Sequence, residues 1–264
     1  MLNKNTEQTG GIMADERRST IMEIINSTGR VRVQDLVRRF NTTSVTIRND
    51  LNELQKRGLL LRSHGGAAKP DARLHESPFH DRIQAHIEEK RRIGALAASL
   101  IREDEIIILD SGTTTDEIAK QIKNRTRLQV ITNGVNVANE LLGSTGVHTI
   151  ILGGTLRSDS ASIVGRSTEE MLNQLSADKL FMGGAGCDPD FGISGANLEE
   201  AAVNKAMLRV AREVILVADA TKFEKRSMSR IASFSEVHTV ISDSSMPLAI
   251  QEKIRAFGCK LMLA

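Results

Sequence analysis

Apolar residues in the first quarter of the chain recur at spacings of three and four, which is typical of short amphipathic helices. The first predicted helix begins near Asp15 or Glu16, either of which can cap it, and ends at Gly29. A second helix follows, and a third begins at Thr43 and ends at Gly58. Their buried stripes are Ile21, Ile24 and Ile25, then Val33, Leu36, Val37 and Phe40, then Ile47, Leu51 and Leu54.

A turn at residues 41–43 separates the second predicted helix from the third. Three short helices with such a turn form a helix-turn-helix, whose last helix enters the major groove of DNA. The segment from Leu59 to Gly66 carries a run of leucines and a Gly-Gly pair, so we expect a β-wing with a glycine turn. The N-terminal part is therefore predicted to be a winged helix-turn-helix.

From about Ile87 the pattern changes to helix and strand in alternation, and this continues to the C-terminus. Residues 106–109 form a continuous apolar run, as expected of a strand that is buried on both faces of a parallel sheet. Such alternation predicts an α/β fold. Further strands are predicted at residues 128–131, 147–152, 180–182, 214–218, 239–241 and 260–263.

A chain of 264 residues is long enough for two unequal domains. We expect a flexible tail at residues 1–14 and a winged helix-turn-helix domain at residues 15–70. A linker is expected at residues 71–86, where polar residues and two prolines, Pro70 and Pro78, mark the stretch. The remaining residues, 87–264, are expected to form the α/β domain.

The composition, 40% hydrophobic and 26% charged, is ordinary for a soluble globular protein. Apolar runs reach only about five residues, far short of the roughly 18–20 that span a bilayer. The first dozen residues lack the apolar core of a signal peptide. Cys187 and Cys259 have no metal-site spacing and suit a reducing compartment. We therefore expect a cytoplasmic protein without a membrane partner or a bound metal.

The net charge of +2 conceals an asymmetry between the two parts of the chain. Residues 1–70 contain 12 Lys and Arg against 7 Asp and Glu, and the remainder contains 23 against 26. A basic N-terminal part on a mildly acidic body indicates that this part meets a polyanion. The lack of Trp and Tyr argues against the aromatic stacking platforms that bind single-stranded nucleic acid.

The third predicted helix has a polar outward face once its buried stripe is removed. Arg can pair with guanine and Asn with adenine, while Ser and Thr near the helix start can hold phosphates. Asp50 does not suit this face, and we expect it to hold a nearby arginine. A packing module with a solvated polar face is the alternative. The candidate DNA-binding residues are Thr43, Ser44, Thr46, Arg48, Asn49, Asn52, Arg57, Arg62 and His64.

Small polar residues follow several predicted strands of the α/β domain. After residues 106–109 they lead into a helix, whose first N–H groups and hydroxyls suit an anion. Ligands of open α/β sheets bind outside the carboxyl ends of the strands, so we expect these loops to share one crevice. Helix capping and solvated charges are the alternative explanation. The candidate effector-binding residues are Asp110, Ser111, Gly112, Thr113, Thr114, Thr115, Thr132, Asn133, Gly153, Gly154, Arg157, Gly183, Glu200 and Lys222.

The N-terminal part also contains a long pattern with fixed spacing. It consists of Arg17-x3-Ile21-x3-Ile25, then Thr43-x2-Thr46-Ile47-Arg48-Asn49-Asp50-Leu51, then Arg62-x-His64-Gly65-Gly66-Ala67. This pattern resembles the helix-turn-helix signature of the DeoR family of bacterial transcriptional regulators. Asn49 stands where the family most often carries Arg, which puts a simple transfer of the operator sequence in doubt.

The resemblance continues through the α/β domain, at Asp110–Thr114, Thr132-Asn133, Gly153–Arg157, Asp178–Gly183, Glu200-Ala201 and Asp219–Lys222. It implies a sensor domain similar in fold to ribose-5-phosphate isomerase and the coenzyme A transferases, with a sugar phosphate as effector. Residues 109–139 look most similar to the N-acetylgalactosamine-type (aga operon) repressors of the family, which implies an amino-sugar phosphate. The resemblance thus implies a repressor of a sugar or amino-sugar catabolic operon that a phosphorylated sugar releases from duplex operator DNA.

A homodimer or homotetramer is expected, because helix-turn-helix proteins usually bind paired half-sites. The alternative function is a sugar-phosphate isomerase-like enzyme, in which Asp110, Glu200 or Lys222 would supply an acid–base pair. An isomerase has no use for a basic helix-turn-helix. We therefore expect a regulator rather than an enzyme, with no cofactor besides its effector.

Overall fold

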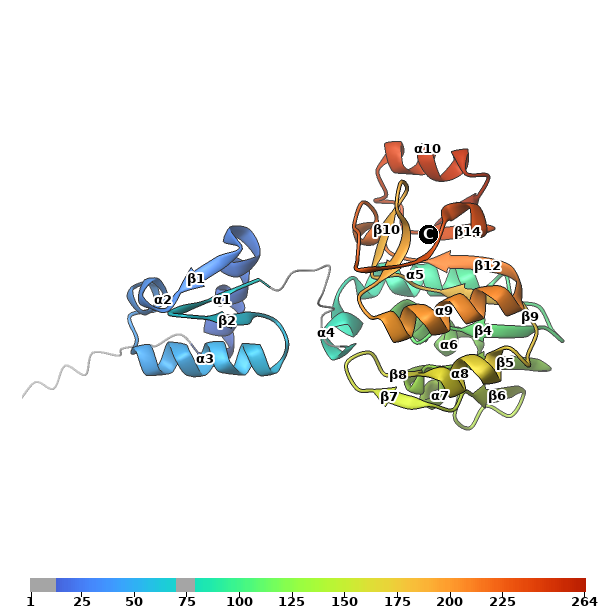
Figure 1. Ribbon diagram of the computed structural model, residues 1–264, viewed down its shortest axis with the longest axis horizontal. Helices are drawn as coiled ribbons and strands as arrows, with labels where there is room; N and C mark the ends of the chain where they lie inside the picture. Colours follow the sequence, from blue (N-terminus) through green and yellow to red (C-terminus); the bar gives the residue numbers. More distant parts are fainter. Residues whose placement is uncertain (1–12, 70–78) are drawn as a thin grey trace, which may run out of the picture. The chain divides into compact units, whose positions relative to one another are not determined.

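The protein is described by a computed structural model at residues 13–69 and 79–264. The chain divides into two units, Met1–Asp71 and Ala72–Ala264, shown in Figure 1. The expected tail at residues 1–14 lies outside the described residues up to residue 12, and Ala14 already begins a helix. The expected linker at residues 71–86 lies outside them up to residue 78. From there the structure differs from the expectation, because residues 79–84 form a helix.

The first unit is a winged helix-turn-helix, as predicted from the helical spacing and the glycine pair. Its helices are α1 (Ala14–Thr28), α2 (Val33–Phe40) and α3 (Ser44–Lys56). Its sheet contains β1 (Arg30–Arg32), β2 (Leu61–Ser63) and β3 (Gly66–Ala68), in the antiparallel order β1-β3-β2. The sequence did not predict β1, since three residues between two helices give no visible period.

Local contacts explain where these elements begin and end. Thr43 caps α3, because its Oγ1 accepts a hydrogen bond from the Thr46 N–H at 3.2 Å. Gly66 brings β3 close against β1, because a Cβ at that position would lie 2.0 Å from the Val31 carbonyl oxygen. The buried core of the unit joins all three helices and the wing, through Ile21, Ile25, Val31, Val33, Leu36, Ile47, Leu51, Leu54, Leu60 and Ala67.

A buried carboxylate fastens α3 to α1. Asp50 is 2% exposed, and it accepts hydrogen bonds from Arg17 Nε at 2.6 Å and from Arg18 Nε at 3.0 Å. The sequence-based expectation for Asp50 is confirmed. The contact turns the Asp50 carboxylate away from the outward face, where Arg48, Asn49 and Asn52 are exposed.

The second unit is built on a seven-stranded parallel sheet with the order β15-β14-β12-β9-β4-β5-β6. Every strand predicted from an apolar run belongs to this sheet. The strands are β4 (Ile106–Leu109), β5 (Leu128–Thr132), β6 (Val147–Ile151), β9 (Ala177–Met182), β12 (Ala211–Val217), β14 (Thr239–Ser242) and β15 (Lys260–Leu263).

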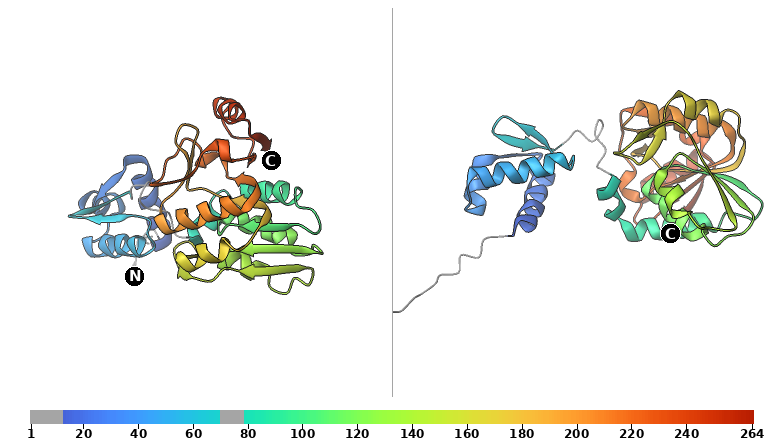
Figure 2. Two further views of the ribbon diagram at one scale, coloured as in Figure 1. Left: turned by 45° about the vertical axis from the view of Figure 1, so that its right-hand side comes forward. Right: turned by 90° about the horizontal axis from the view of Figure 1, so that it is seen from below.

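Helices cover both faces of this sheet, as Figures 1 and 2 show. One face carries α5 (Ile87–Ala98), α6 (Thr113–Ile122) and α7 (Val135–Glu140). The other carries α8 (Arg166–Leu172), α9 (Leu198–Val210) and α10 (Leu248–Ala256). Successive strand residues point to opposite faces, so Ile107 and Leu109 belong to the first core and Ile108 to the second.

Short elements lie at the two ends of the sheet. On the carboxyl-end side they are the helix α4 (Phe79–Gln84), the hairpin β7 (Thr155–Arg157) and β8 (Ser162–Val164), the 3₁₀ helix η1 (Ala220–Lys222), and an antiparallel sheet of β10 (Gly186–Asp188), β11 (Gly192–Gly195) and β13 (Ser229–Ala232). A second 3₁₀ helix, η2 (Phe234–Glu236), precedes β14 at the amino-end side. These elements are three to six residues long, which is too short for a period to show in the sequence.

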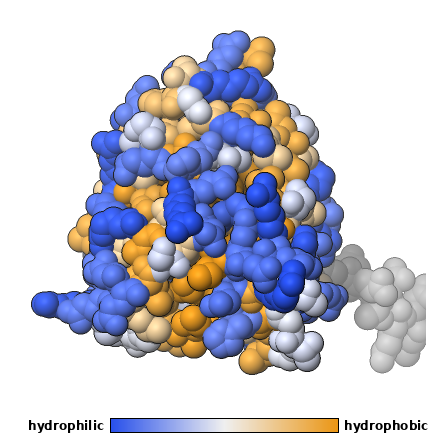
Figure 3. All heavy atoms as spheres, turned by 90° about the vertical axis from the view of Figure 1, so that its right-hand side faces the viewer, coloured by the Kyte–Doolittle hydropathy of each residue, from blue (hydrophilic) through white to orange (hydrophobic). Residues whose placement is uncertain are grey.

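The face in Figure 3 carries many hydrophilic side chains, with hydrophobic ones between them in its lower middle and its upper part. Large apolar side chains that stay exposed include Leu142, Leu156, Leu198 and Leu248, between 58% and 76% exposed. Among the described residues, no helix has the length and apolar character needed to cross a membrane.

We predict that Asp50→Ala loosens the packing of α3 on α1. Loss of hydrogen bonds to charged partners costs about 1.5–3 kcal/mol, which corresponds to amide exchange in α3 at least about 10-fold faster. Hydrogen exchange of the full chain, followed by mass spectrometry, measures this. Asp35→Ala is the control, because it removes an ion pair with Arg38 in which both side chains are more than half exposed. Equal α3 exchange in the two variants would contradict the role of Asp50.

Candidate functional site

The strand order of the large sheet reverses between β4 and β9. The chain runs from β4 through β5 to β6 on one side, and then continues with β9 on the other side of β4. Such a reversal leaves a crevice at the carboxyl ends of the two strands, where open α/β sheets bind ligands. The structure has a pocket at this point, and residues directly after β4 and β9 line it.

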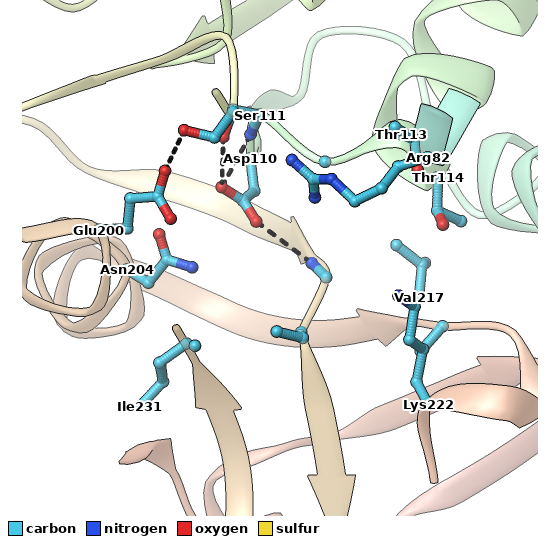
Figure 4. Close-up of a pocket in the computed structure, with 17 residues that line it drawn as sticks. Arg82, Asp110, Ser111, Thr113, Thr114, Glu200, Asn204, Val217, Lys222 and Ile231 are labelled. Atoms are coloured by element: carbon cyan, nitrogen blue, oxygen red, sulfur yellow. Dashed lines mark hydrogen bonds between the residues drawn. The ribbon is translucent and has the colours of Figure 1, made fainter. Parts of the chain in front are cut away.

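The pocket brings together many of the predicted effector residues. Those that line it are Asp110, Ser111, Gly112, Thr113, Thr114, Gly183, Glu200 and Lys222. They lie directly after β4 and β9 and in the first turns of α6, α9 and η1, and Figure 4 shows the side chains it labels around a common space. The predicted crevice therefore contains a physical cavity.

Asp110 links the ends of the two central strands. It lies directly after β4, is 7% exposed, and its Oδ2 accepts a hydrogen bond from the Gly183 N–H after β9 at 3.3 Å. Its Oδ1 accepts a bond from the Ser111 N–H at 2.7 Å. These contacts hold a carboxylate in a fixed position on the pocket floor, as the dashed lines in Figure 4 show.

One side of the pocket favours an anion. Gly112 is the N-cap of α6 and gives it no side-chain cap, so the first N–H groups of α6 meet the pocket at Thr113 and Thr114. Arg82 of α4 and Lys222 of η1 line the same pocket, and Figure 4 shows Arg82 beside these threonines. A helix N-terminus flanked by two cations is a strong site for a phosphate or carboxylate.

A third cation lies behind this side. Lys90 of α5 is 3% exposed, and its ammonium group donates a hydrogen bond to the Arg82 carbonyl oxygen. The pKa of Lys90 is lowered to about 8, mainly by burial and also by the cations Lys222 and Arg82, while Asp219 and Glu117 act in the opposite direction. The positive charges of Arg82, Lys90 and Lys222 are therefore close enough to repel one another.

The opposite side of the pocket carries a second carboxylate. Glu200 stands in the first turn of α9, where Asn197 Oδ1 caps the helix by accepting bonds from the Glu199 and Glu200 N–H groups at 2.9 and 3.0 Å. Asn204 lies one turn further along α9 and also lines the pocket. Figure 4 shows Glu200 and Asn204 together, across from Arg82 and Lys222.

The donors to Glu200 converge on one of its oxygens. Oε1 accepts hydrogen bonds from Ser160 Oγ, from Ser162 Oγ at 2.7 Å and from Arg157 Nε at 3.3 Å. Within residues 13–69 and 79–264, no donor is seen for Oε2. Arg157, predicted to bind the effector, therefore contacts Glu200 and does not line the pocket.

The other predicted effector residues brace the loops around the pocket. Thr115 Oγ1 donates to the Asp110 and Gly112 carbonyls at 2.5 and 2.7 Å, and Thr132 Oγ1 donates to the Leu109 carbonyl at 2.7 Å. Asn133, Gly153 and Gly154 do not line the pocket either. Asn133 Nδ2 donates to the Ile163 carbonyl, the Gly153 carbonyl accepts from Thr168 Oγ1, and Gly154 packs so closely that a Cβ would lie 2.2 Å from that Oγ1.

Sequence reasoning missed several residues of the pocket, of which Arg82, Ser160 and Asn204 carry polar side chains. Arg82 lay in the stretch interpreted as a linker, although Phe79 and Ile83 have helical spacing there. Ser160 lies in the β7–β8 hairpin turn, which has no sequence signature. Asn204 could have been found, because it follows Glu200 by one helical turn.

The predicted DNA-binding residues lie on α3, its cap and the wing. Asn49 and Asn52 are exposed on α3, and Thr43 and Thr46 form its cap. Ser44, Arg48 and His64 line one groove together with Arg32 and Arg38. Arg57 forms an ion pair with Glu53, with 3.7 Å between Nε and Oε1. Arg62 lies in β2, and its buried Nη1 has no hydrogen-bond partner in the described residues. The groove between α2, α3 and the wing is thus strongly basic.

No group of three or more His, Cys, Asp and Glu side chains is placed to hold a metal ion within the part of the chain that the structure describes.

We predict a pH dependence from Lys90. Its pKa is lowered from 10.5 to about 8, so the unfolded chain binds more protons between these values and Lys90 adds stability as pH rises through this window. Relative to Lys90→Met, the free energy of unfolding of the wild type should rise by about 2–4 kcal/mol from pH 8 to pH 10.5. Urea denaturation followed by circular dichroism measures it. The exposed Lys253→Met serves as control, and parallel profiles for Lys90→Met and wild type would contradict the prediction.

The comparisons with known proteins agree with this arrangement. Residues 17–73 match the model of a DeoR-like helix-turn-helix domain, and residues 85–244 match that of a DeoR C terminal sensor domain. The "Putative aga operon transcriptional repressor" of Escherichia coli O157:H7 is 36% identical over 250 residues, covering 94% of this chain and 93% of the relative. The "Glycerol-3-phosphate regulon repressor" of Escherichia coli K12 is 34% identical over 248 residues, covering 94% and 98%.

Among solved structures, ribose 5-phosphate isomerase A from Methanocaldococcus jannaschii is similar at a TM-score of 0.39 and 15% identity, covering 53% of this chain and 55% of the isomerase. The family models between them span nearly the whole described chain, and both relatives extend over both units. The chain therefore belongs to the DeoR family and is a DNA-binding transcriptional repressor rather than an enzyme.

Proposed function

We propose that this protein represses a sugar catabolic operon and that a phosphorylated sugar releases it from its operator. The observation that carries the proposal is the division of one pocket into a cationic side and a carboxylate side. A sugar phosphate has the matching division, with a dianionic phosphate at one end and hydroxyl or amino groups at the other. The names of the two relatives, an aga operon repressor and a glycerol-3-phosphate regulon repressor, support this class of regulated pathway.

The phosphate is proposed to bind at the N-terminus of α6. The N–H groups of Thr113 and Thr114 would donate to its oxygens, and Arg82 and Lys222 would neutralise its charge. A dianion would also relieve the repulsion that lowers the pKa of Lys90, because it adds negative charge near the three cations.

The sugar end is proposed to lie against Asp110, Glu200 and Asn204. The donors to Glu200 converge on Oε1, so its Oε2 can accept bonds from a ligand, and Asp110 is held at the same pocket by the N–H groups of Ser111 and Gly183. Carboxylates accept hydrogen bonds from hydroxyls, and they pair more strongly with an ammonium group. A sugar phosphate with a free ammonium group would therefore fit this pocket better than its hydroxyl analogue.

Release would follow from linkage between the two sites. A ligand that prefers the form with low operator affinity shifts the equilibrium by its differential affinity, and a shift from 99% to 1% bound needs about 5.5 kcal/mol. Arg82 gives the effector a direct contact with α4, the first described element after the DNA-binding unit. We further propose a homodimer or homotetramer, in which several effector sites add their contributions and two recognition helices bind paired half-sites.

We predict that Lys222→Ala leaves operator affinity intact and raises the sugar phosphate concentration needed for release at least about 10-fold, from the loss of one charge-assisted bond. Gel-shift titrations use duplex DNA from upstream of the chain's own gene, with a panel of sugar phosphates that includes amino sugars. Lys253→Ala, an exposed lysine of α10, is the matched control.

Arg48→Ala should instead weaken operator binding by about 1–3 kcal/mol.

Each failure in this titration has its own meaning. An unchanged response of Lys222→Ala would remove the proposed phosphate position. Specific binding that no sugar phosphate reverses would contradict the effector, and a lack of specific binding would contradict operator recognition.

We predict that Glu200→Gln reduces selectivity for an amino group. With wild-type protein, glucosamine 6-phosphate or galactosamine 6-phosphate should release the operator at about 10-fold lower concentration than the matching hexose 6-phosphate, because an ammonium–carboxylate bond is stronger than a neutral one. In Glu200→Gln this ratio should fall to about 3 or less, as the charge is lost and the shape is kept. A ratio near 1 in the wild type would contradict the amino-sugar proposal and leave the phosphate site untouched.

A further inference from the structure

Val45 is an apolar side chain in an unusual position. It lies in the first turn of α3 and is 62% exposed, although the other members of the outward face, Arg48, Asn49 and Asn52, are polar. It takes no part in the core of the unit, which is built on Ile47, Leu51 and Leu54 on this helix. Its isopropyl group is therefore open to solvent in the free protein.

The position of Val45 on the helix is opposite the core. At about 100° per residue, Val45, Asn49 and Asn52 form one stripe along α3, on the side away from Ile47 and Leu51. In a helix-turn-helix, residues near the N-terminus of the recognition helix contact base edges. Val45 thus stands at the point of α3 where contact with the major groove is closest.

We propose that Val45 recognises a thymine through its C5-methyl group. Thymine is the one standard base with a methyl group on its major-groove edge, and an isopropyl group can pack on it without leaving a donor or acceptor unpaired. Val45 would read this apolar edge beside the polar edges available to Arg48 and Asn52. The proposal rests on the proposed operator binding, and it specifies one base that the protein recognises there.

The stability of the helix does not explain a valine at this position. Valine has a lower helix propensity than alanine, because its branched Cβ restricts the side chain. Val45 gains little burial to offset this lower helix propensity, since more than half of its surface is exposed. Burial against a base would supply the missing contact. Replacement of Val45 by alanine also leaves the core untouched, so the variant protein should fold normally.

The test removes the thymine methyl group and nothing else. Duplexes are selected from a random pool with the full-length wild-type protein, and each thymine of the selected site is then replaced in turn by deoxyuridine, which pairs identically and lacks the methyl group. Operator affinity is measured by fluorescence anisotropy for the wild type, Val45→Ala and Gln55→Ala. Gln55 is exposed near the far end of α3 and serves as the matched control.

We expect one thymine per half-site at which deoxyuridine weakens wild-type binding about 4-fold, and about 15-fold when both half-sites are changed, as for one buried methyl group each. Val45→Ala should bind the thymine and deoxyuridine duplexes with affinities within about 2-fold at that position, while Gln55→Ala keeps the wild-type difference. The proposal is overturned if deoxyuridine at that thymine weakens binding of Val45→Ala by the same factor as binding of the wild type. It is also overturned if no thymine of the site is sensitive to deoxyuridine in the wild type. If the wild type selects no sequence from the pool, operator recognition fails as well.

Discussion

The reversal of strand order between β4 and β9 is the constraint on which the sensor unit depends. The chain continues from β4 to one side of the sheet and from β9 to the other, so the loops after these two strands diverge and leave a gap between the strand ends. The gap exposes backbone N–H groups and a helix N-terminus, which need partners. Asp110 supplies part of them, because it accepts a bond from Gly183 and so bridges the two strand ends. The start of α6 has no side-chain cap, and its residues Thr113 and Thr114 line the pocket, where the proposed anion would accept hydrogen bonds from their N–H groups.

The same side of the pocket is positively charged. Arg82 and Lys222 line it next to the start of α6, and Lys90 lies behind them. Their mutual repulsion and the burial of Lys90 disfavour the empty pocket. A phosphate bound as proposed would offset both effects, so part of its binding energy would come from repulsion that the fold already contains. Since α4 carries Arg82 and has no fully buried residue of its own, a phosphate in this position would act on α4 directly.

The sequence predicted what depends on local pattern and failed where contacts are made between distant segments. The seven strands of the large sheet and the Thr43 cap follow from strong apolar runs or from residues a few positions apart. The position of Asp50 on the helix predicted that it holds an arginine, but its partners Arg17 and Arg18 lie 33 and 32 positions away and could not be named. The pocket was located for the same reason, since strand ends meet at one edge. The β7–β8 hairpin and α4 were missed, and with them Ser160 and Arg82. Thr115 and Thr132 are of a residue type that is common in ligand-binding loops, yet their hydroxyls bond to backbone carbonyls. Only three-dimensional contacts distinguish a threonine that binds a ligand from one that supports a loop.

Both functional regions depart from the rule that apolar side chains are buried and polar ones exposed, and they do so in opposite directions. In the sensor unit Lys90 is charged and almost fully buried, whereas in the DNA-binding unit Val45 is apolar and exposed. Each departure is unfavourable in the free protein unless a partner is present. Asp50 shows the contrast, because it is equally buried and two arginines satisfy it. A buried charge with its partners in place therefore supports the fold, and a group whose best partner is outside the chain marks a binding site.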